Sequence, residues 1–253
     1  MIGIIPAAGA GQRMQPLGCS KELLPVGSRV VEGVERPKAV SEYMVERMIA
    51  AGATQICMII SAEKSDIVRY YAERTFAAEI FYVVQPRPAG LCDALFRAES
   101  FARSHEHVLI GLPDTIWFPE NGYLQVLDRD AAGANLLLFP VSNPSAFDAV
   151  VGDDNGLVRR IEVKQPHPPT RWIWGAVAIS GHIFQTLKLL WESRHRRDEY
   201  LGSLLNAYLE AGGAIRGHWI GETYMDVGTV EGYRAALDFL RQGQRQTSTV
   251  RAA

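Results

Sequence analysis

A glycine-rich segment near the start of the chain carries residue types that could bind phosphate. Ala8, Gly9 and Gly11 are followed by Arg13 and then by Lys21. Glycine lets the backbone approach a phosphate group, and the backbone N–H groups then face it. An arginine can bind phosphate oxygens through two parallel donors, and a lysine adds a point charge. The segment therefore predicts a triphosphate-binding loop; the alternative is a surface loop whose cations are merely solvated.

Two common phosphate-binding motifs match this segment poorly. A Rossmann loop needs a third glycine where this chain has Met14, and an acidic residue about 20 positions later. A Walker loop ends in Gly-Lys-Ser or Gly-Lys-Thr, and these glycines are not followed by either. These differences argue against a nicotinamide-dependent dehydrogenase.

The elements that must position this loop alternate between short apolar runs and amphipathic segments. We predict buried strands at Ile2–Pro6, Ile56–Ser61, Ile80–Val84 and His107–Leu112, and helices at Pro37–Ala51, Glu63–Ala78 and Gly90–Ser104. Such alternation is typical of an α/β fold with a doubly wound, mainly parallel sheet. Ligands bind at the carboxyl ends of such strands. Residues 9–13, residues 85–90 and Asp114 all follow strands, so we expect them to converge.

The pattern changes after Asp114. We predict strands at Asn135–Pro140, Phe147–Val151, Leu157–Val163, Trp172–Ile179 and Ala214–Ile220, and helices at Ile183–Ser193, Asp198–Ala211 and Glu231–Leu240. A hairpin turn at residues 152–156 makes the sheet mixed. Residues 27–36 and 224–229 are predicted loops. We expect one domain over residues 1–241, with halves of about 1–134 and 135–241, and a disordered tail at 242–253.

Composition excludes several classes of protein. The 253 residues carry 26 Lys and Arg against 28 Asp and Glu, so a net charge of −2 gives no bulk attraction for nucleic acid or an anionic membrane. No apolar run approaches the roughly 18 residues of a membrane helix. The three cysteines are too few for a disulfide framework or a zinc knuckle. No signal-like segment precedes the first strand, so we expect a soluble cytoplasmic protein.

The opening segment resembles that of the sugar-1-phosphate nucleotidylyltransferases, a family that includes glucose-1-phosphate thymidylyl- and uridylyltransferases. The family's opening pattern is matched by Gly9, Gly11, Arg13, Pro16, Ser20, Lys21, Leu23, Leu24, Pro25 and Val26. The resemblance extends over most of the chain, to about Leu240. It implies a Rossmann-like nucleotidyltransferase core with a small sugar-binding β insertion, with the nucleotide in the first half and the sugar and metal in the second.

The resemblance also implies a reaction. A nucleoside monophosphate passes from dTTP or UTP to a sugar-1-phosphate, giving a nucleotide sugar and pyrophosphate. The nucleoside triphosphate and the sugar-1-phosphate are then the partners, and the chain could form a homo-oligomer. Arg13, Lys21 and Lys164 are the implied catalytic residues, since each can act on phosphate charge, while Ala8, Gly9 and Gly11 bind the nucleotide.

Gln85 and Gly90 lie in a proline-rich connection that resembles the base-reading loop of the family. Glutamine offers one donor and one acceptor, which complement the edge of uracil or thymine. That edge does not separate UTP from dTTP. The alternative is a strand-to-helix connection that contacts no ligand.

Asp114 and Asp226 match the two residues that hold Mg²⁺ in the family. Two carboxylates, phosphate oxygens and waters make an ordinary Mg²⁺ shell. The chain departs from the family pattern at Pro113, where a glycine is usual. Each aspartate could instead be a turn or helix-cap residue, and Asp226 could cap the helix near Glu231.

The segment Glu162-Val163-Lys164 departs from the family pattern at its middle residue. The resemblance implies Lys164 on the sugar phosphate, and Glu162 and Gly175 beside the sugar. Val163, however, stands where the family has the glutamate that contacts sugar hydroxyls, and Glu162 points to the opposite face of a strand. The identity of the sugar is therefore open, and Lys164 could instead be a solvated lysine.

A second hypothesis comes from a different class of function. The chain could be a catalytically silent regulatory or scaffold relative that still binds a nucleotide sugar. Pro113 and Val163 favour this alternative, while the presence of Arg13, Lys21 and the two aspartates argues against it. Release of pyrophosphate would distinguish the two hypotheses.

Overall fold

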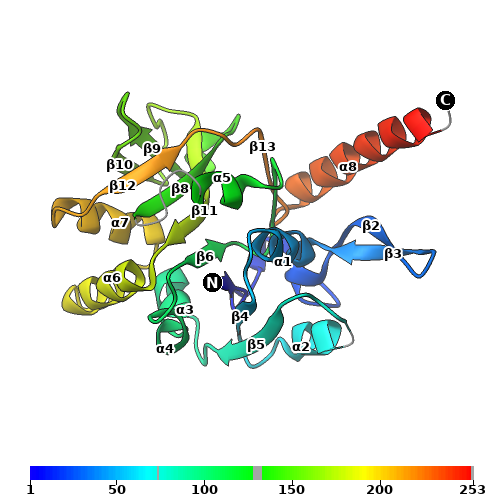
Figure 1. The fold of residues 1–253 in the computed structure, drawn as a ribbon, viewed down its shortest axis with the longest axis horizontal. Coiled ribbons are helices and arrows are strands. Elements are labelled where there is room, and N and C mark those ends of the chain that lie inside the picture. Colours follow the sequence, from blue (N-terminus) through cyan, green and yellow to red (C-terminus); the bar gives the residue numbers. More distant parts are fainter. Residues whose placement is uncertain (73, 128–132, 252–253) are drawn as a thin grey trace.

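A mixed sheet of nine strands forms the centre of the described part of the chain (Figure 1). The structure, a computed structural model, describes residues 1–72, 74–127 and 133–251. Strand β1 (Ile2–Pro6) pairs in parallel with β4 (Gln55–Ile60) on one side and with β6 (Val108–Gly111) on the other. Strand β5 (Glu79–Val84) extends this parallel part beyond β4. The alternating pattern predicted all four strands.

The other part of the sheet is largely antiparallel. Strand β11 (Trp172–Ile179) runs antiparallel to β6, to β8 (Ala134–Pro140) and to β9 (Asp148–Gly152). Strand β10 (Val158–Val163) forms the predicted hairpin with β9, and β12 (Ile215–His218) pairs in parallel with β8. Because β11 pairs with β6, the two halves of the chain share one sheet, and the predicted α/β fold with a mixed sheet is confirmed.

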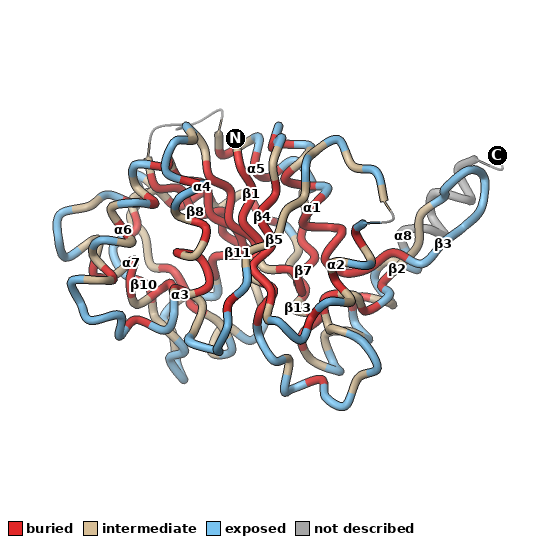
Figure 2. Tube along the Cα trace, turned by 90° about the horizontal axis from the view of Figure 1, so that it is seen from below, coloured by how far each residue is buried: buried red, intermediate tan, exposed pale blue. Residues whose placement is uncertain are grey.

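Helices cover both faces of the sheet because its central strands are apolar on both sides. Figure 2 shows β1, β4 and β11 buried along almost their whole length. One face packs against α3 (Gly90–Phe96), α6 (Gly181–Ser193) and α7 (Leu201–Glu210). The other packs against α1 (Val40–Ala50), α2 (Ser65–Ala72) and α5 (Gly122–Leu127).

Residues 27–36, predicted as a surface loop, instead form a hairpin. Strand β2 (Pro25–Val31) pairs antiparallel with β3 (Val34–Ala39). Glu32 and Gly33 at its tip both have positive φ, at 52° and 79°, which is the geometry of a two-residue hairpin turn. The prediction was wrong because a Glu-Gly turn is a weaker signal than Asn-Gly or Asp-Gly. The hairpin projects on the same side as α8 (Val230–Arg251), as Figure 1 shows.

A second, two-stranded sheet joins distant parts of the chain. Strand β13 (Thr223–Asp226) pairs antiparallel with β7 (Thr115–Phe118). Residues 224–229 were predicted as a loop, and the first three of them are instead part of β13. Four-residue strands are too short to show a period in the sequence. This pairing sets the positions of Asp114 and Asp226.

Several helices differ from their predicted bounds. Helix α2 ends at Ala72, short of the predicted Ala78, and the predicted helix at 90–104 divides into α3 and α4 (Glu99–Ala102). The short helix α5 was not predicted. Helix α8 continues to Arg251, where the sequence predicted a helix ending at Leu240 and a tail from residue 242; residues 252–253 lie outside the described residues. None of the helices in the described ranges combines the length and apolar content of a membrane span.

Gly175 in β11 provides a test of the packing. A Cβ atom there would lie 2.6 Å from ring carbons of Phe139 and of Tyr224, so the two rings fill the space that a side chain would need. We expect Gly175→Ala to lower the free energy of unfolding by about 1–3 kcal/mol through overpacking. Urea unfolding measures the change. Gly18→Ala is the control, because nothing lies within 4 Å of the added carbon, and an equal loss in both variants would contradict this packing role.

Candidate active site

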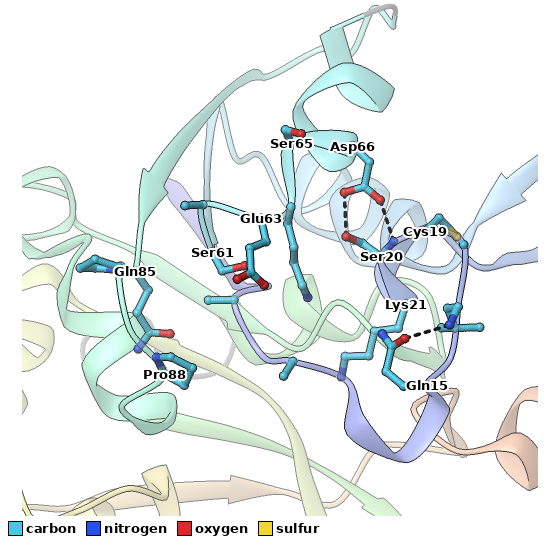
Figure 3. Close-up of a pocket in the computed structure, with 17 residues that line it drawn as sticks. Gln15, Cys19, Ser20, Lys21, Ser61, Glu63, Ser65, Asp66, Gln85 and Pro88 are labelled. Atoms are coloured by element: carbon cyan, nitrogen blue, oxygen red, sulfur yellow. Dashed lines mark hydrogen bonds between the residues drawn. The ribbon is translucent and has the colours of Figure 1, made fainter.

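A pocket of about 500 Å³ opens at the carboxyl ends of three parallel strands (Figure 3). Its walls come from residues after β1, between Ala8 and Lys21, from residues 61–66 after β4, and from residues 85–88 after β5. The sequence predicted that the first and third of these segments would converge, and they do. The contribution of the segment after β4 was not predicted.

Two interactions, one buried and one partly buried, hold the loop after β1 in place. Lys64 donates to both carboxylate oxygens of Glu22 at 2.8 Å and to the carbonyl oxygen of Ala7 at 2.7 Å. The backbone N–H and hydroxyl of Ser20 donate to Asp66 at 2.6 and 2.7 Å. Burial raises the pKa of Asp66, but these donors outweigh it and the pKa falls below its usual value. Because Ser20 and Glu22 flank Lys21, both interactions help to fix its backbone.

The amide of Gln85 has a defined orientation in the pocket. Its Nε2 donates to Asp93 Oδ2 at 2.7 Å and to the carbonyl oxygen of Gly90 at 3.3 Å. Both partners can only accept, so the nitrogen must face them and Oε1 is the atom left for a ligand. Gly90 itself has φ of +85°, and a Cβ there would lie 2.6 Å from Glu199 Cγ, so no other residue fits.

A second pocket of about 500 Å³ adjoins the first, and Lys21 lines both. The charged residues in its wall are Arg13, Lys21, Asp114, Lys164 and Asp226. Of the sequence-predicted residues, these five are therefore brought together. They come from loops after β1 and β6, from the end of β10 and from the end of β13.

The two aspartates face one small space. The N–H of Val227 donates to the carbonyl oxygen of Asp114 at 2.8 Å, which ties the loop after β13 to that before β7. A Cβ at Gly228 would lie 2.7 Å from Asp114 Oδ2 and 2.8 Å from Asp226 Oδ1. The missing side chain thus leaves a space bounded by two carboxylate oxygens. Asp226 does not cap α8, because Thr229 Oγ1 accepts from Gly232 N at the start of that helix.

Each aspartate is paired with a cation. Lys21 Nζ lies 2.5 Å from Asp114 Oδ2, and Arg13 Nη1 lies 3.3 Å from Asp226 Oδ2. Burial alone lowers the pKa of Lys21, but Asp114 outweighs it and the pKa is raised, so the ammonium stays charged. Two carboxylate oxygens beside one space fit a hard cation such as Mg²⁺, which takes oxygen ligands. No group of three or more His, Cys, Asp or Glu residues gathers as a metal centre within residues 1–72, 74–127 and 133–251.

The predicted sugar-side residues separate into two groups. Lys164, with φ of +49°, donates to the carbonyl oxygen of Ala146 at 2.6 Å and lines the second pocket. Glu162 forms an ion pair with Arg160 and lines neither of the two pockets, and Gly175 is covered by aromatic rings. The close approach at Gly175 is thus made by protein rings, whereas the sequence had assigned it to a ligand.

A buried carboxylate that the sequence analysis missed lies opposite Val163. Asp148 pairs with Val163 across β9 and β10, and its Oδ2 accepts from Trp174 Nε1 at 3.4 Å. Its Oδ1 is buried without a hydrogen-bond partner, and burial raises its pKa. The available signal was a charged residue at the start of an apolar strand. Lys64, Asp66 and Asp93 were also missed, although each follows the end of a predicted strand.

Comparison with known proteins shows which sequences and folds this chain is similar to. The sequence model of the family described as nucleotidyl transferase matches residues 2–243. The chain is 30% identical to the glucose-1-phosphate thymidylyltransferase of Neisseria meningitidis, over 96% of this chain and 84% of the relative. A candidate glucose-1-phosphate thymidylyltransferase from Bacillus anthracis superposes with a TM-score of 0.81 at 24% identity, over 95% of this chain and 96% of the other. The UTP-bound UGPase of Acinetobacter baumannii gives 0.73 at 21% identity, over 93% and 91%.

The buried pair of Glu22 and Lys64 yields a prediction about stability. Removing one partner leaves the other charge buried and uncompensated, so Glu22→Leu and Lys64→Met should each lower the free energy of unfolding by about 3–5 kcal/mol. The double variant should lose much less than the two losses added together. Urea unfolding of the wild type, the two single variants and the double variant completes the double-mutant cycle. Arg196→Ala, which breaks an exposed pair with Glu192, should change little; strictly additive losses in the cycle would contradict the coupling.

Proposed function

The chain belongs to the nucleotidyl transferase family, and on that premise we propose that it transfers a nucleoside monophosphate from UTP or dTTP to a sugar-1-phosphate. The observation that carries the proposal is the junction of the two pockets. Gln85 lines the first, Arg13 and the two aspartates line the second, and Lys21 reaches both. A triphosphate with its base at Gln85 and its phosphates at Lys21 would present its α-phosphorus to the second pocket.

The reaction needs positioning and charge stabilisation more than covalent help from the protein. A phosphate oxygen of the sugar-1-phosphate forms a bond to the α-phosphorus as the bond to the β-phosphate oxygen breaks, and pyrophosphate leaves. Lys164, at the far wall of the second pocket, would hold the attacking phosphate. Arg13 would bind the leaving β- and γ-phosphates, and Lys21 the α-phosphate. The attacking phosphate is already ionised near neutral pH, so no general base is needed.

Asp114 and Asp226 are the residues that would hold Mg²⁺ in this reaction. Bound there, the ion would screen repulsion between the two substrates and stabilise developing charge. Lys21 and Arg13 now neutralise these two carboxylates. On substrate binding, both cations would exchange their carboxylate partners for phosphate oxygens, so the charge of the pocket stays balanced.

In this proposal the base and the sugar bind on opposite sides of the junction between the two pockets. Gln85 Oε1 would accept from N3–H, which uracil and thymine share, so this contact admits both UTP and dTTP. Glucose 1-phosphate is the first sugar phosphate to test, because the relatives named above include glucose-1-phosphate thymidylyltransferases. Val163 offers no acceptor for a sugar hydroxyl, so the preferred sugar would lack that hydroxyl or be held there by another group.

A matrix of triphosphates against sugar-1-phosphates tests the proposal. With Mg²⁺, pyrophosphate release is expected for UTP or dTTP and little for ATP or GTP, and a chelator should abolish it. Asp226→Asn should lose most of the rate while remaining folded. Binding of UTP without pyrophosphate from any sugar phosphate would favour the silent alternative, and a purine triphosphate used best would overturn the base assignment.

Lys21 should act mainly on the transition state. Charge grows on the phosphates as pyrophosphate leaves, so Lys21→Ala should raise the activation free energy by about 2–4 kcal/mol. This lowers kcat roughly 30- to 1000-fold, with a smaller change in KM. Steady-state kinetics on both substrates measure the split. Lys188→Ala, which removes a lysine paired with Glu99, serves as the control. Wild-type kcat in Lys21→Ala would remove Lys21 from the mechanism.

A further inference from the structure

The orientation of Gln85 depends on a carboxylate that lies behind it. Asp93 in α3 accepts from Gln85 Nε2 through Oδ2 at 2.7 Å. The guanidinium of Arg97, one helical turn later, donates to the two oxygens of Asp93 at 2.9 and 3.2 Å. The side chain of Asp93 is only 14% exposed. Asp93 is thus held from one side by Arg97 and holds Gln85 on the other.

This arrangement leaves one orientation for the Gln85 amide. Turning the amide over would place Oε1 against the Asp93 carboxylate and against the carbonyl oxygen of Gly90, both of which only accept. Two acceptors left facing each other out of contact with water lose their hydrogen bonds and repel. The backbone of Gln85 is also fixed, because its N–H donates to Ile60 O at 2.8 Å and continues the parallel pairing of β4 and β5.

We infer that Asp93 is a positioning residue through which the nucleotide pocket rejects cytidine triphosphate. The inference rests on the proposed function, in which Gln85 meets the pyrimidine edge. Uracil and thymine present a donor, N3–H, to the fixed Oε1 atom. Cytosine presents an unprotonated N3, which is an acceptor, so acceptor faces acceptor and the buried contact is lost. Asp93 thus sets the selectivity through Gln85, without touching the base itself.

Two variants of Asp93 separate this role from a merely structural one. Asp93→Asn can donate to Gln85 Oε1, so the amide can turn and offer Nε2 to cytosine. Asp93→Leu removes the shorter of the two hydrogen bonds and leaves only the 3.3 Å contact with the carbonyl oxygen of Gly90 to orient the amide. In both, the ratio of kcat/KM for UTP to that for CTP should fall roughly tenfold or more. UTP and CTP share ribose and triphosphate, so the ratio reports the base edge alone.

The control is Glu99→Gln. Glu99 lies in α4, the next helix along the chain, and forms a comparable, partly buried pair with Lys188 rather than with Gln85. Its UTP-to-CTP ratio should equal that of the wild type. Binding of UTP and CTP, titrated calorimetrically in the absence of sugar phosphate, gives the same comparison without turnover.

The outcomes distinguish the inference from the proposed function. If the wild type neither binds nor turns over UTP or dTTP, the proposed function fails first. If the wild type prefers UTP and both Asp93 variants stay folded with an unchanged ratio, Asp93 does not set the selectivity and the inference is overturned. Equal losses for UTP and CTP would have the same meaning, because a loss of packing alone does not distinguish the two bases. If Asp93→Leu fails to fold, the UTP-to-CTP ratio of Asp93→Asn alone decides the inference.

Discussion

The antiparallel pairing of β7 with β13 is the constraint on which the rest of the candidate site depends. It sets Asp226 opposite Thr115, and the bond from Val227 N to the carbonyl oxygen of Asp114 closes the connection. Glycine is required at two positions after β13. A Cβ at Gly228 would fill the space between the two carboxylates, and one at Gly232 would lie 1.8 Å from the carbonyl oxygen of Asp226. Two short strands thereby create one place with two carboxylate oxygens.

Charge balance allows two carboxylates to lie close together at this site. Arg13 and Lys21 neutralise Asp226 and Asp114, and a second buried pair, Glu22 with Lys64, supports the loop that carries Lys21. A charge buried without a partner would be costly, so the pairing stabilises the free protein. It also places both cations beside the pocket before any substrate arrives. Preorganised charge of this kind is what phosphoryl transfer uses, since little reorganisation is then left for the reaction itself.

The end of β10 is one place where this chain departs from the pattern that its opening segment resembles. Val163 packs against the apolar core, and the buried carboxylate of Asp148 lies directly across from it. An acidic side chain thus lies on β9, directly beside the position on β10 that Val163 occupies. The environment near Lys164 is therefore polar on one side although Val163 itself offers no polar group.

Local sequence was sufficient for the parts of the molecule that local physics governs. Apolar runs predicted β1, β4 and β6, because a strand buried on both faces must be continuously apolar. The same kind of run predicted β5, which is only partly buried. The glycines with Arg13 and Lys21 predicted a phosphate loop from residue types within one short segment, and that assignment stays a prediction. Tertiary structure alone decided what depends on contacts between distant segments. It pairs β7 with β13 and places Lys64 against Glu22 in the loop that carries Lys21. It also lets Asp93 orient the Gln85 amide and fills the space at Gly175 with aromatic rings. Each of these is set by side chains or strands that meet only after the chain has folded, so no pattern within a short window could reveal them.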